Sequence, residues 1–113
     1  MSTHRLIVFT KPTDGKEAEF NRWYEEVHLP DILATEGFVA AQRFALADTQ
    51  IVDVGDAVPG RYLAIYEIEA DSLEAALDRL NAGSETMEMS DALDLDAATA
   101  IAFSAIGERQ EAK

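Results

Sequence analysis

Two hydrophobic periodicities alternate along the chain, and their order limits the folds it can adopt. Strand-like apolar segments occupy residues 4–11, 38–46, 61–69 and 98–106. Helical periodicity fills the gap between the first and second of these segments and the gap between the third and fourth. The order βαββαβ is satisfied most economically by the ferredoxin-like α+β fold, a four-stranded antiparallel sheet with two helices on one face. We expect a single domain over residues 1–113.

Residues 20–33 carry the apolar stripe of an amphipathic first helix. At about 100° per residue, His28 falls on the same side of this helix as the stripe. Pro30 lacks an N–H group and disfavours helix at the preceding residue, so the regular helix is expected to end near Leu29, although residues 31–34 could add one more turn before Gly37. The stripe itself consists of Phe20, Trp23, Tyr24 and Val27.

Two acidic pairs with the spacing of a capping box predict where the helices begin. Asp14 precedes Glu17 by three residues, and Asp71 precedes Glu74 by the same distance. The sequence of residues 84–95 is ambiguous, and we favour helical turns over a strand there.

All four predicted strands carry apolar residues on both sides. The second strand has Phe38, Ala40, Gln42, Phe44 and Leu46 on one side and Val39, Ala41, Arg43 and Ala45 on the other. Because both helices cover the same face, the second face would leave a large apolar surface in water, which usually marks a subunit interface. Two such sheets facing each other in a two-fold pair would bury it. We therefore expect an obligate homodimer formed through the sheet faces.

The chain is strongly acidic, with 22 Asp and Glu residues against nine Lys and Arg and a net charge of −13. This charge repels nucleic-acid phosphates and anionic lipids, so neither nucleic acid nor a membrane surface is an expected partner. The absence of cysteine excludes disulfides and thiolate catalysis. The apolar run near the N-terminus is too short for a signal sequence or a membrane span, and we expect a cytoplasmic protein.

Residues 20–44 resemble the first half of proteins in the dimeric α/β-barrel superfamily, and most closely its EthD-like members. The similar positions are Asn21-x-Trp23-Tyr24-x-x-x-His28-x-Pro30-Asp31-x-Leu33, followed by Gly37-Phe38-x-x-Ala41-x-Arg43-Phe44. The resemblance implies a ferredoxin-like fold, a face-to-face dimer and a cavity between the sheet and the first helix. Relatives include cofactor-free polyketide cyclases, quinol monooxygenases and haem-degrading monooxygenases, so the resemblance implies a fold more strongly than a reaction.

Three residues are predicted to be catalytic. His28 could act as a general base or acid near neutral pH, although it could instead bond the last carbonyls of its own helix. The resemblance favours the catalytic role. Tyr24 has a hydroxyl that needs a partner when buried. Arg43, on an otherwise apolar strand face, needs a carboxylate, which could come from a substrate or from Glu67.

Five further residues are predicted to bind the substrate, and each has a structural alternative. Trp23 could simply pack in the core, and Asp31 could cap a helical turn rather than orient His28. Tyr62 and Tyr66 flank a small alanine and form either an aromatic notch or ordinary packing. The five residues are Trp23, Asp31, Phe44, Tyr62 and Tyr66.

The favoured function is a small, metal-free and cofactor-independent enzyme that transfers protons through His28 on an apolar aromatic or polyketide-like molecule. A cyclase, isomerase, lyase or cofactor-free oxygenase would fit this chemistry. The alternative is a non-catalytic dimer that binds a small molecule. A haem-binding monooxygenase with His28 as axial ligand is disfavoured, because Asn21, Trp23 and His28 lie on one helix rather than on separate elements as in the haem-binding relatives. His4 is expected to be exposed, and the two histidines match no metal-ligand spacing.

Overall fold

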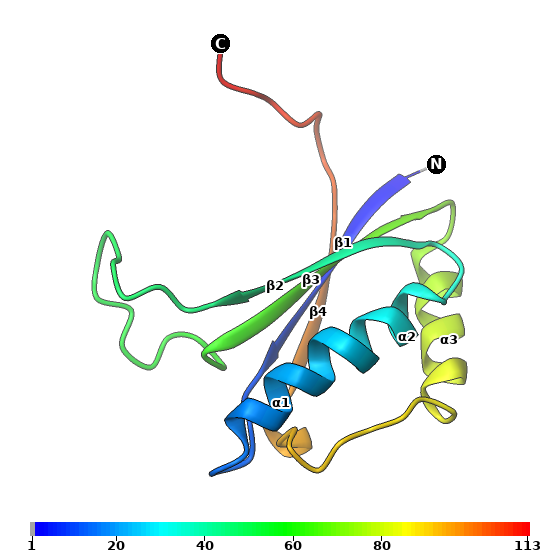
Figure 1. Ribbon diagram of the computed structural model, residues 1–113. Coiled ribbons are helices and arrows are strands. Elements are labelled where there is room, and N and C mark those ends of the chain that lie inside the picture. The colour runs from blue at the N-terminus through cyan, green and yellow to red at the C-terminus, as the bar shows by residue number, and fades with distance from the viewer. Residues whose placement is uncertain (1) are drawn as a thin grey trace.

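Four strands form one antiparallel sheet, and the helices lie on one of its faces (Figure 1). The computed structural model describes residues 2–113. The strands are β1 (Ser2–Thr10), β2 (Phe38–Ala45), β3 (Tyr62–Ala70) and β4 (Thr99–Ser104). Their order across the sheet is β2-β3-β1-β4, with β1 and β3 in the centre. This order confirms the ferredoxin-like fold that the sequence predicts.

The first helix is longer than predicted and changes type twice without a break. Its three parts are α1 (Glu17–Trp23), the π-helical turn η1 (Tyr24–His28) and α2 (Leu29–Leu33). The prediction that Pro30 ends the helix near Leu29 is wrong, because Pro30 lies in the first turn of α2. The Leu29 N–H bonds to the carbonyl of Tyr24, five residues back. This wider turn, immediately before Pro30, accommodates a ring that would clash with the preceding turn of a regular α-helix.

Neither helix begins with the acidic cap that the sequence predicts. The residue preceding α1 is Lys16, and no side chain caps this end, so Asp14 and Glu17 form no capping box. Helix α3 (Leu73–Ser84) begins one residue later than an Asp71 cap would place it. Its cap is Ser72, whose hydroxyl accepts a hydrogen bond from the Ala75 N–H at 3.1 Å.

The chain between α3 and β4 is mostly irregular, so the helical turns predicted over residues 84–95 are wrong for most of this segment. Its only regular element is the short 3₁₀ turn η2 (Leu95–Ala97). The Trp23 indole N–H donates a hydrogen bond to the Glu88 carbonyl at 2.9 Å. The Glu88 carbonyl would have a backbone partner within a helix. Here the side chain of Trp23, on the first helix, is its partner instead.

A β-bulge in β2 changes which residues share a face of the sheet. The pairing register shifts between Phe38 and Ala40, so Phe38 faces the helices together with Ala41 and Arg43. Beyond the bulge, Phe44 points to the opposite face. The prediction that Phe38 and Phe44 lie on the same face is therefore wrong, because strict alternation fails across a bulge.

The hydrophobic core lies between the sheet and the helices. His4, predicted to be exposed, is in fact only 8% exposed, because it alternates with Thr3 and Arg5 and so points toward the helices like Leu6. Its Nδ1 lies 2.7 Å from the Ser104 hydroxyl on the neighbouring strand. The largest fully buried side chains of the core are Phe20, Trp23, Tyr24, Tyr66 and Ile68.

The face of the sheet without helices, called the open face below, is apolar. The cross-strand register aligns Ile65, Ile7 and Ile101 in one row across β3, β1 and β4. Phe44 and Phe103 at its edges are 44% and 50% exposed. The large apolar side chains of the open face are Ile7, Phe9, Phe44, Leu63, Ile65, Ile101 and Phe103.

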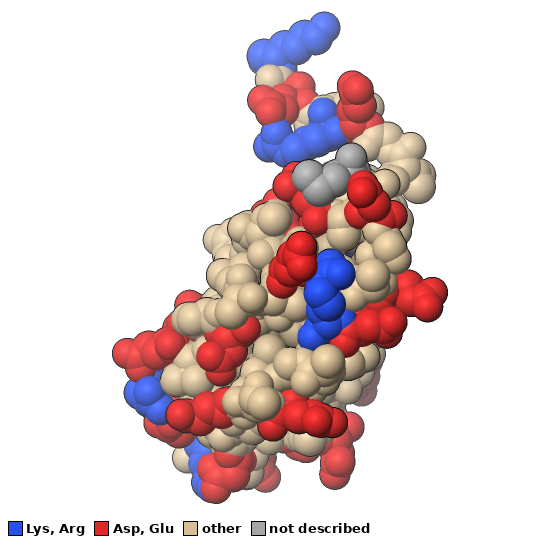
Figure 2. Space-filling view, turned by 90° about the vertical axis from the view of Figure 1, so that its right-hand side faces the viewer, with Lys and Arg blue, Asp and Glu red and all other residues tan. Residues whose placement is uncertain are grey.

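Acidic side chains outnumber basic ones on the side of the molecule seen in Figure 2, as they do in the whole sequence. In residues 2–113, no helix combines the length and the apolar character needed to cross a membrane.

Candidate functional site

Trp23, Tyr24 and His28, all predicted site residues, meet at the π-helical turn η1. In a regular α-helix, Trp23 and His28 would point about 140° apart, since they are separated by five residues. Hydrogen bonding over five residues places them one above the other instead. Their rings stack with centroids 4.6 Å apart and an interplanar angle of 21°. The Tyr24 ring meets His28 edge-on at 5.0 Å. π-helical turns of this kind occur frequently at functional sites.

The His28 side chain is half-buried and uncharged at neutral pH. Burial lowers the pKa of His28, and the negative charge of Asp31 opposes this shift only in part. The His28 Nδ1 is buried and has no hydrogen-bond partner in residues 2–113. Bonding to the last carbonyls of its own helix, the structural alternative for this residue, is thus not seen in the described part of the chain. Asp31 acts on His28 through its charge.

Arg43 fills the space between the first helix and the sheet, and its side chain is only 9% exposed. The guanidinium carbon lies 4.6 Å from the centre of the Tyr24 ring and 5.3 Å from that of Phe20. Nη2 donates a hydrogen bond to the side-chain oxygen of Asn21 at 2.8 Å. The nearest carboxylate, that of Glu25, lies 3.5 Å from Nη1 and is exposed. Aromatic ring faces and an amide therefore stabilise most of this buried charge.

The partner that the sequence suggested for Arg43 lies on the other side of the sheet. Glu67 points to the open face, where its carboxylate lies 3.5 Å from the guanidinium of Arg5. Asn21 takes the place of Glu67 beside Arg43. The sequence analysis did not select Asn21 as a site residue. Its place in the motif shared with the EthD-like proteins is the one sequence feature that could have suggested its contact with Arg43.

Tyr24 and Tyr66 form a buried hydroxyl pair beside Arg43. The Tyr66 hydroxyl donates a hydrogen bond to that of Tyr24 at 3.3 Å. Burial raises the pKa of both phenols, so both keep their protons throughout the neutral range. Because the Tyr66 proton is donated to Tyr24, the Tyr24 hydroxyl is the one of the pair that can donate to an oxygen that gains negative charge.

The structure brings together five of the eight predicted site residues, and of the other three Tyr62 also lies near Arg43, with its ring centre 5.7 Å from the guanidinium carbon. Phe44 lies on the open face, on the far side of the sheet from His28, because of the bulge in β2. Tyr62 contacts Phe20 with ring centroids 5.3 Å apart, and its hydroxyl donates a hydrogen bond to the Glu17 carboxylate. Asp31 lies beyond His28 in α2. The residues brought together are Trp23, Tyr24, His28, Arg43 and Tyr66.

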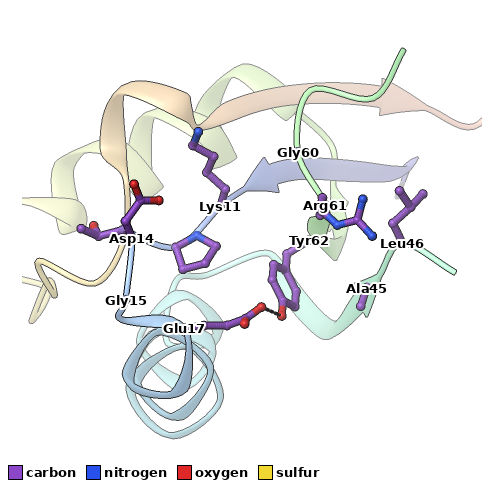
Figure 3. A pocket seen from close by; sticks show the side chains of 11 residues that line it. Lys11, Asp14, Gly15, Glu17, Ala45, Leu46, Gly60, Arg61 and Tyr62 are labelled. Atoms are coloured by element: carbon purple, nitrogen blue, oxygen red, sulfur yellow. Dashed lines mark hydrogen bonds between the residues drawn. The ribbon is translucent and has the colours of Figure 1, made fainter. Parts of the chain in front are cut away.

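The cavity that the family resemblance implies between the first helix and the sheet is filled by side chains. Phe20, Tyr24 and Tyr66 occupy this space, and each is at most 2% exposed. A cleft of about 560 Å³ lies instead at one end of the sheet, where Tyr62 is the one predicted site residue that lines it (Figure 3). Within residues 2–113, no group of three or more His, Asp or Glu side chains is arranged to hold a metal ion.

The buried, neutral His28 predicts a specific dependence of stability on pH. Because the folded-state pKa is lowered from 6.5, the unfolded chain takes up a proton more readily than the folded one. The stabilisation from a neutral His28 is therefore fully present above about pH 6.5. It is lost as the pH falls through the lowered pKa of His28 in the folded state. Urea unfolding at pH 7.5 and pH 5.5 should show a larger loss for the parent than for His28→Gln. Equal losses in the two proteins would contradict the prediction.

No protein-family model and no curated protein matches the sequence. Solved structures do match. An EthD family protein from Bacillus halodurans has a TM-score of 0.59 and 15% identity, covering 97% of this chain and 100% of its own. HapK from Hahella chejuensis has a TM-score of 0.53 and 12% identity, with 100% of both chains covered. A protein of unknown function from Nitrosomonas europaea has a TM-score of 0.50 and 17% identity, covering 100% of this chain and 98% of its own. The chain is thus a ferredoxin-like α+β protein that has the fold of an EthD family protein.

Proposed function

We propose that this chain is a homodimeric, cofactor-independent enzyme that moves a proton on an apolar aromatic or polyketide-like molecule, with His28 as the base. The observation that carries the proposal is the state of His28. Its ring is stacked on Trp23, its pKa is lowered by burial, and its Nδ1 is buried without a partner. A neutral imidazole held in this way is ready to accept a proton at pH 7.

The neighbours of His28 suit removal of a proton from a carbon next to a carbonyl. The imidazole would take the proton, and the electron pair left behind would move onto the carbonyl oxygen as an enolate. The protonated Tyr24 hydroxyl, which accepts the hydrogen bond from Tyr66, is available as a donor, and the Arg43 cation lies against the Tyr24 ring. Such groups stabilise a developing oxyanion. Return of the proton from His28 to another carbon of the enolate system would complete an isomerisation. Attack of the enolate carbon on a second carbonyl of the same molecule, whose oxygen then takes the proton, would complete a cyclisation. Expulsion of a leaving group from the β-carbon, with the proton passing to that group, would complete an elimination.

The homodimer in this proposal is supported by the open face. Its central row of three isoleucines and its exposed Phe44 and Phe103 would remain in contact with water in a single chain. Pairing two open faces about a two-fold axis would bury both surfaces at once.

The second candidate function is binding without catalysis, and the packing near His28 favours it. The space between the first helix and the sheet is filled, and the 560 Å³ cleft lies at the other end of α1. A binding protein would show affinity for an apolar ligand without any chemical change in it.

Deuterium exchange at the carbon beside a carbonyl tests the proposed function without knowledge of the substrate. A suitable probe is 2-tetralone in deuterated buffer, with loss of its α-proton signals followed by NMR. The parent protein should accelerate exchange, and His28→Gln should reduce the acceleration by about 10²–10⁴-fold. Asp78→Asn, an exposed change on α3, serves as the control and should leave the exchange rate unchanged.

Two outcomes would overturn the catalytic proposal. One is an exchange rate in His28→Gln equal to that of the parent, with both proteins folded by circular dichroism. The other is saturable binding of 2-tetralone without acceleration of exchange, which is the result expected of the binding protein.

A further inference from the structure

The cleft at the end of the sheet is formed by three segments distant in sequence. It lies where residues 11–17, between β1 and α1, meet the end of β2 and the start of β3 (Figure 3). Its volume of about 560 Å³ is in the range of sites that hold small organic molecules. The side chains that give it chemical character are Lys11, Asp14, Glu17, Leu46, Arg61 and Tyr62.

Lys11 and Arg61 are unusual among the basic residues of this chain. Of its nine Lys and Arg residues, five form ion pairs, and Arg79 donates a hydrogen bond to the Glu36 carbonyl. Within residues 2–113, the side chains of Lys11 and Arg61 form neither an ion pair nor a hydrogen bond, and the third such residue is the C-terminal Lys113. Two unpaired cations on one cleft are unexpected in a chain with 22 acidic residues.

The Tyr62 ring forms the wall of the cleft between Lys11 and Arg61. A hydrogen bond fixes its hydroxyl, and the backbone next to it is closely packed. The Tyr62 hydroxyl donates a hydrogen bond to the Glu17 carboxylate. This bond fixes the position of the ring and engages one of the two carboxylates that line the cleft. Beside the ring, Gly60 approaches the backbone of Thr10 so closely that a Cβ atom would lie 2.7 Å from the Thr10 carbonyl oxygen. The junction between β1 and β3 therefore leaves no room for a larger residue at position 60.

We infer that this cleft binds a small aromatic monocarboxylate. Lys11 and Arg61 would contact the carboxylate, and the ring of the ligand would lie against Tyr62 and Leu46. Asp14, which lies beside Lys11 in the cleft (Figure 3), disfavours a second negative charge on the ligand. The cleft includes Glu17, eleven residues before His28, which is about 15 Å along the helix axis. It is therefore a second site that does not include His28, although its Tyr62 ring also lies near Arg43.

Titration with benzoate, followed by amide chemical shifts, tests this inference. The shifts of Lys11, Gly15, Gly60 and Arg61 should saturate, whereas equal concentrations of benzyl alcohol or acetate should cause smaller, unsaturated changes. The double variant Lys11→Gln/Arg61→Gln should bind benzoate at least about tenfold more weakly, since two charge-assisted hydrogen bonds are lost. Tyr62→Leu should also weaken binding, and His28→Gln should leave it unchanged.

The matched control is Arg109→Gln/Lys113→Gln, which lowers the net charge by the same two units at the C-terminal end of the chain. It should bind benzoate with the affinity of the parent. Equal affinities in the parent and the Lys11→Gln/Arg61→Gln variant would overturn the inference. So would saturable shifts confined to the open face, or binding of benzyl alcohol as tight as that of benzoate. Because His28 takes no part in this binding, failure here is distinguishable from failure of the proposed catalytic function.

Discussion

Replacing Trp23 with alanine is expected to lower the free energy of unfolding by about 3–5 kcal/mol. The side chain is 1% exposed, and its ring packs on both Tyr24 and His28. Its indole N–H is the hydrogen-bond partner of the Glu88 carbonyl, so truncation also removes a tie between the first helix and the irregular segment before β4. Urea unfolding followed by far-UV circular dichroism measures the change.

Two control variants separate the contributions of Trp23. Trp23→Phe keeps an aromatic ring over His28 but removes the N–H donor, and should cost less than Trp23→Ala. Ile51→Ala truncates a fully exposed side chain and should change the free energy of unfolding by less than about 0.5 kcal/mol. A decrease of less than about 1 kcal/mol in the free energy of unfolding of Trp23→Ala would show that the packing of Trp23 on Tyr24 and His28 contributes little to stability.

The order and approximate limits of the strands could be predicted because they depend on periodicity and turn residues. Strand β3, for instance, spans residues 62–70 where the alternating pattern predicts 61–69. The helix caps were less predictable. Ser72 and Asp71 are both good capping residues, and the choice between them depends on backbone geometry that a residue pattern does not contain.

Two local irregularities account for most of the differences between the predicted and the observed positions of the site residues. The bulge between Phe38 and Ala40 places Phe38 on the helix-covered face and Phe44 on the open face, whereas strict alternation puts both on the same face. The π-helical turn η1 rotates His28 over Trp23. Each irregularity inserts about one residue into a regular repeat. In β2, strict alternation therefore assigns the side chains on the two sides of the bulge to the wrong relative faces.

A sequence signal for the π-turn exists in Pro30. A helical pattern that continues past a proline requires the preceding turn to relieve the clash with the ring, and widening the turn is one way to do so. The pattern of residues 20–33 does continue, since Ile32 is buried against the core. The filled interior could not be foreseen in the same way, because the packing of Phe20 and Tyr24 against Arg43 depends on contacts between the first helix and β2.

Introducing a carboxylate at the centre of the open face is expected to abolish the proposed homodimer. Ile7 lies in β1 between Ile65 and Ile101, so Ile7→Asp would place a negative charge in the middle of the buried surface in each of the two chains. Like charges across an interface without partners oppose association strongly. Sedimentation should give the parent twice the 12.4 kDa mass of one chain and the variant close to 12.4 kDa.

Ile51→Asp is the matched control, because it makes the same chemical change at a fully exposed position in the loop between β2 and β3. It should leave the mass at that of the dimer. If Ile7→Asp unfolds while Ile51→Asp remains a folded dimer, burial of the open face is required for folding, as an obligate dimer demands. A parent protein that sediments at 12.4 kDa at all concentrations, or a dimer that survives Ile7→Asp, would refute pairing through the open face. The exposed Phe44 and Phe103 would then need another explanation.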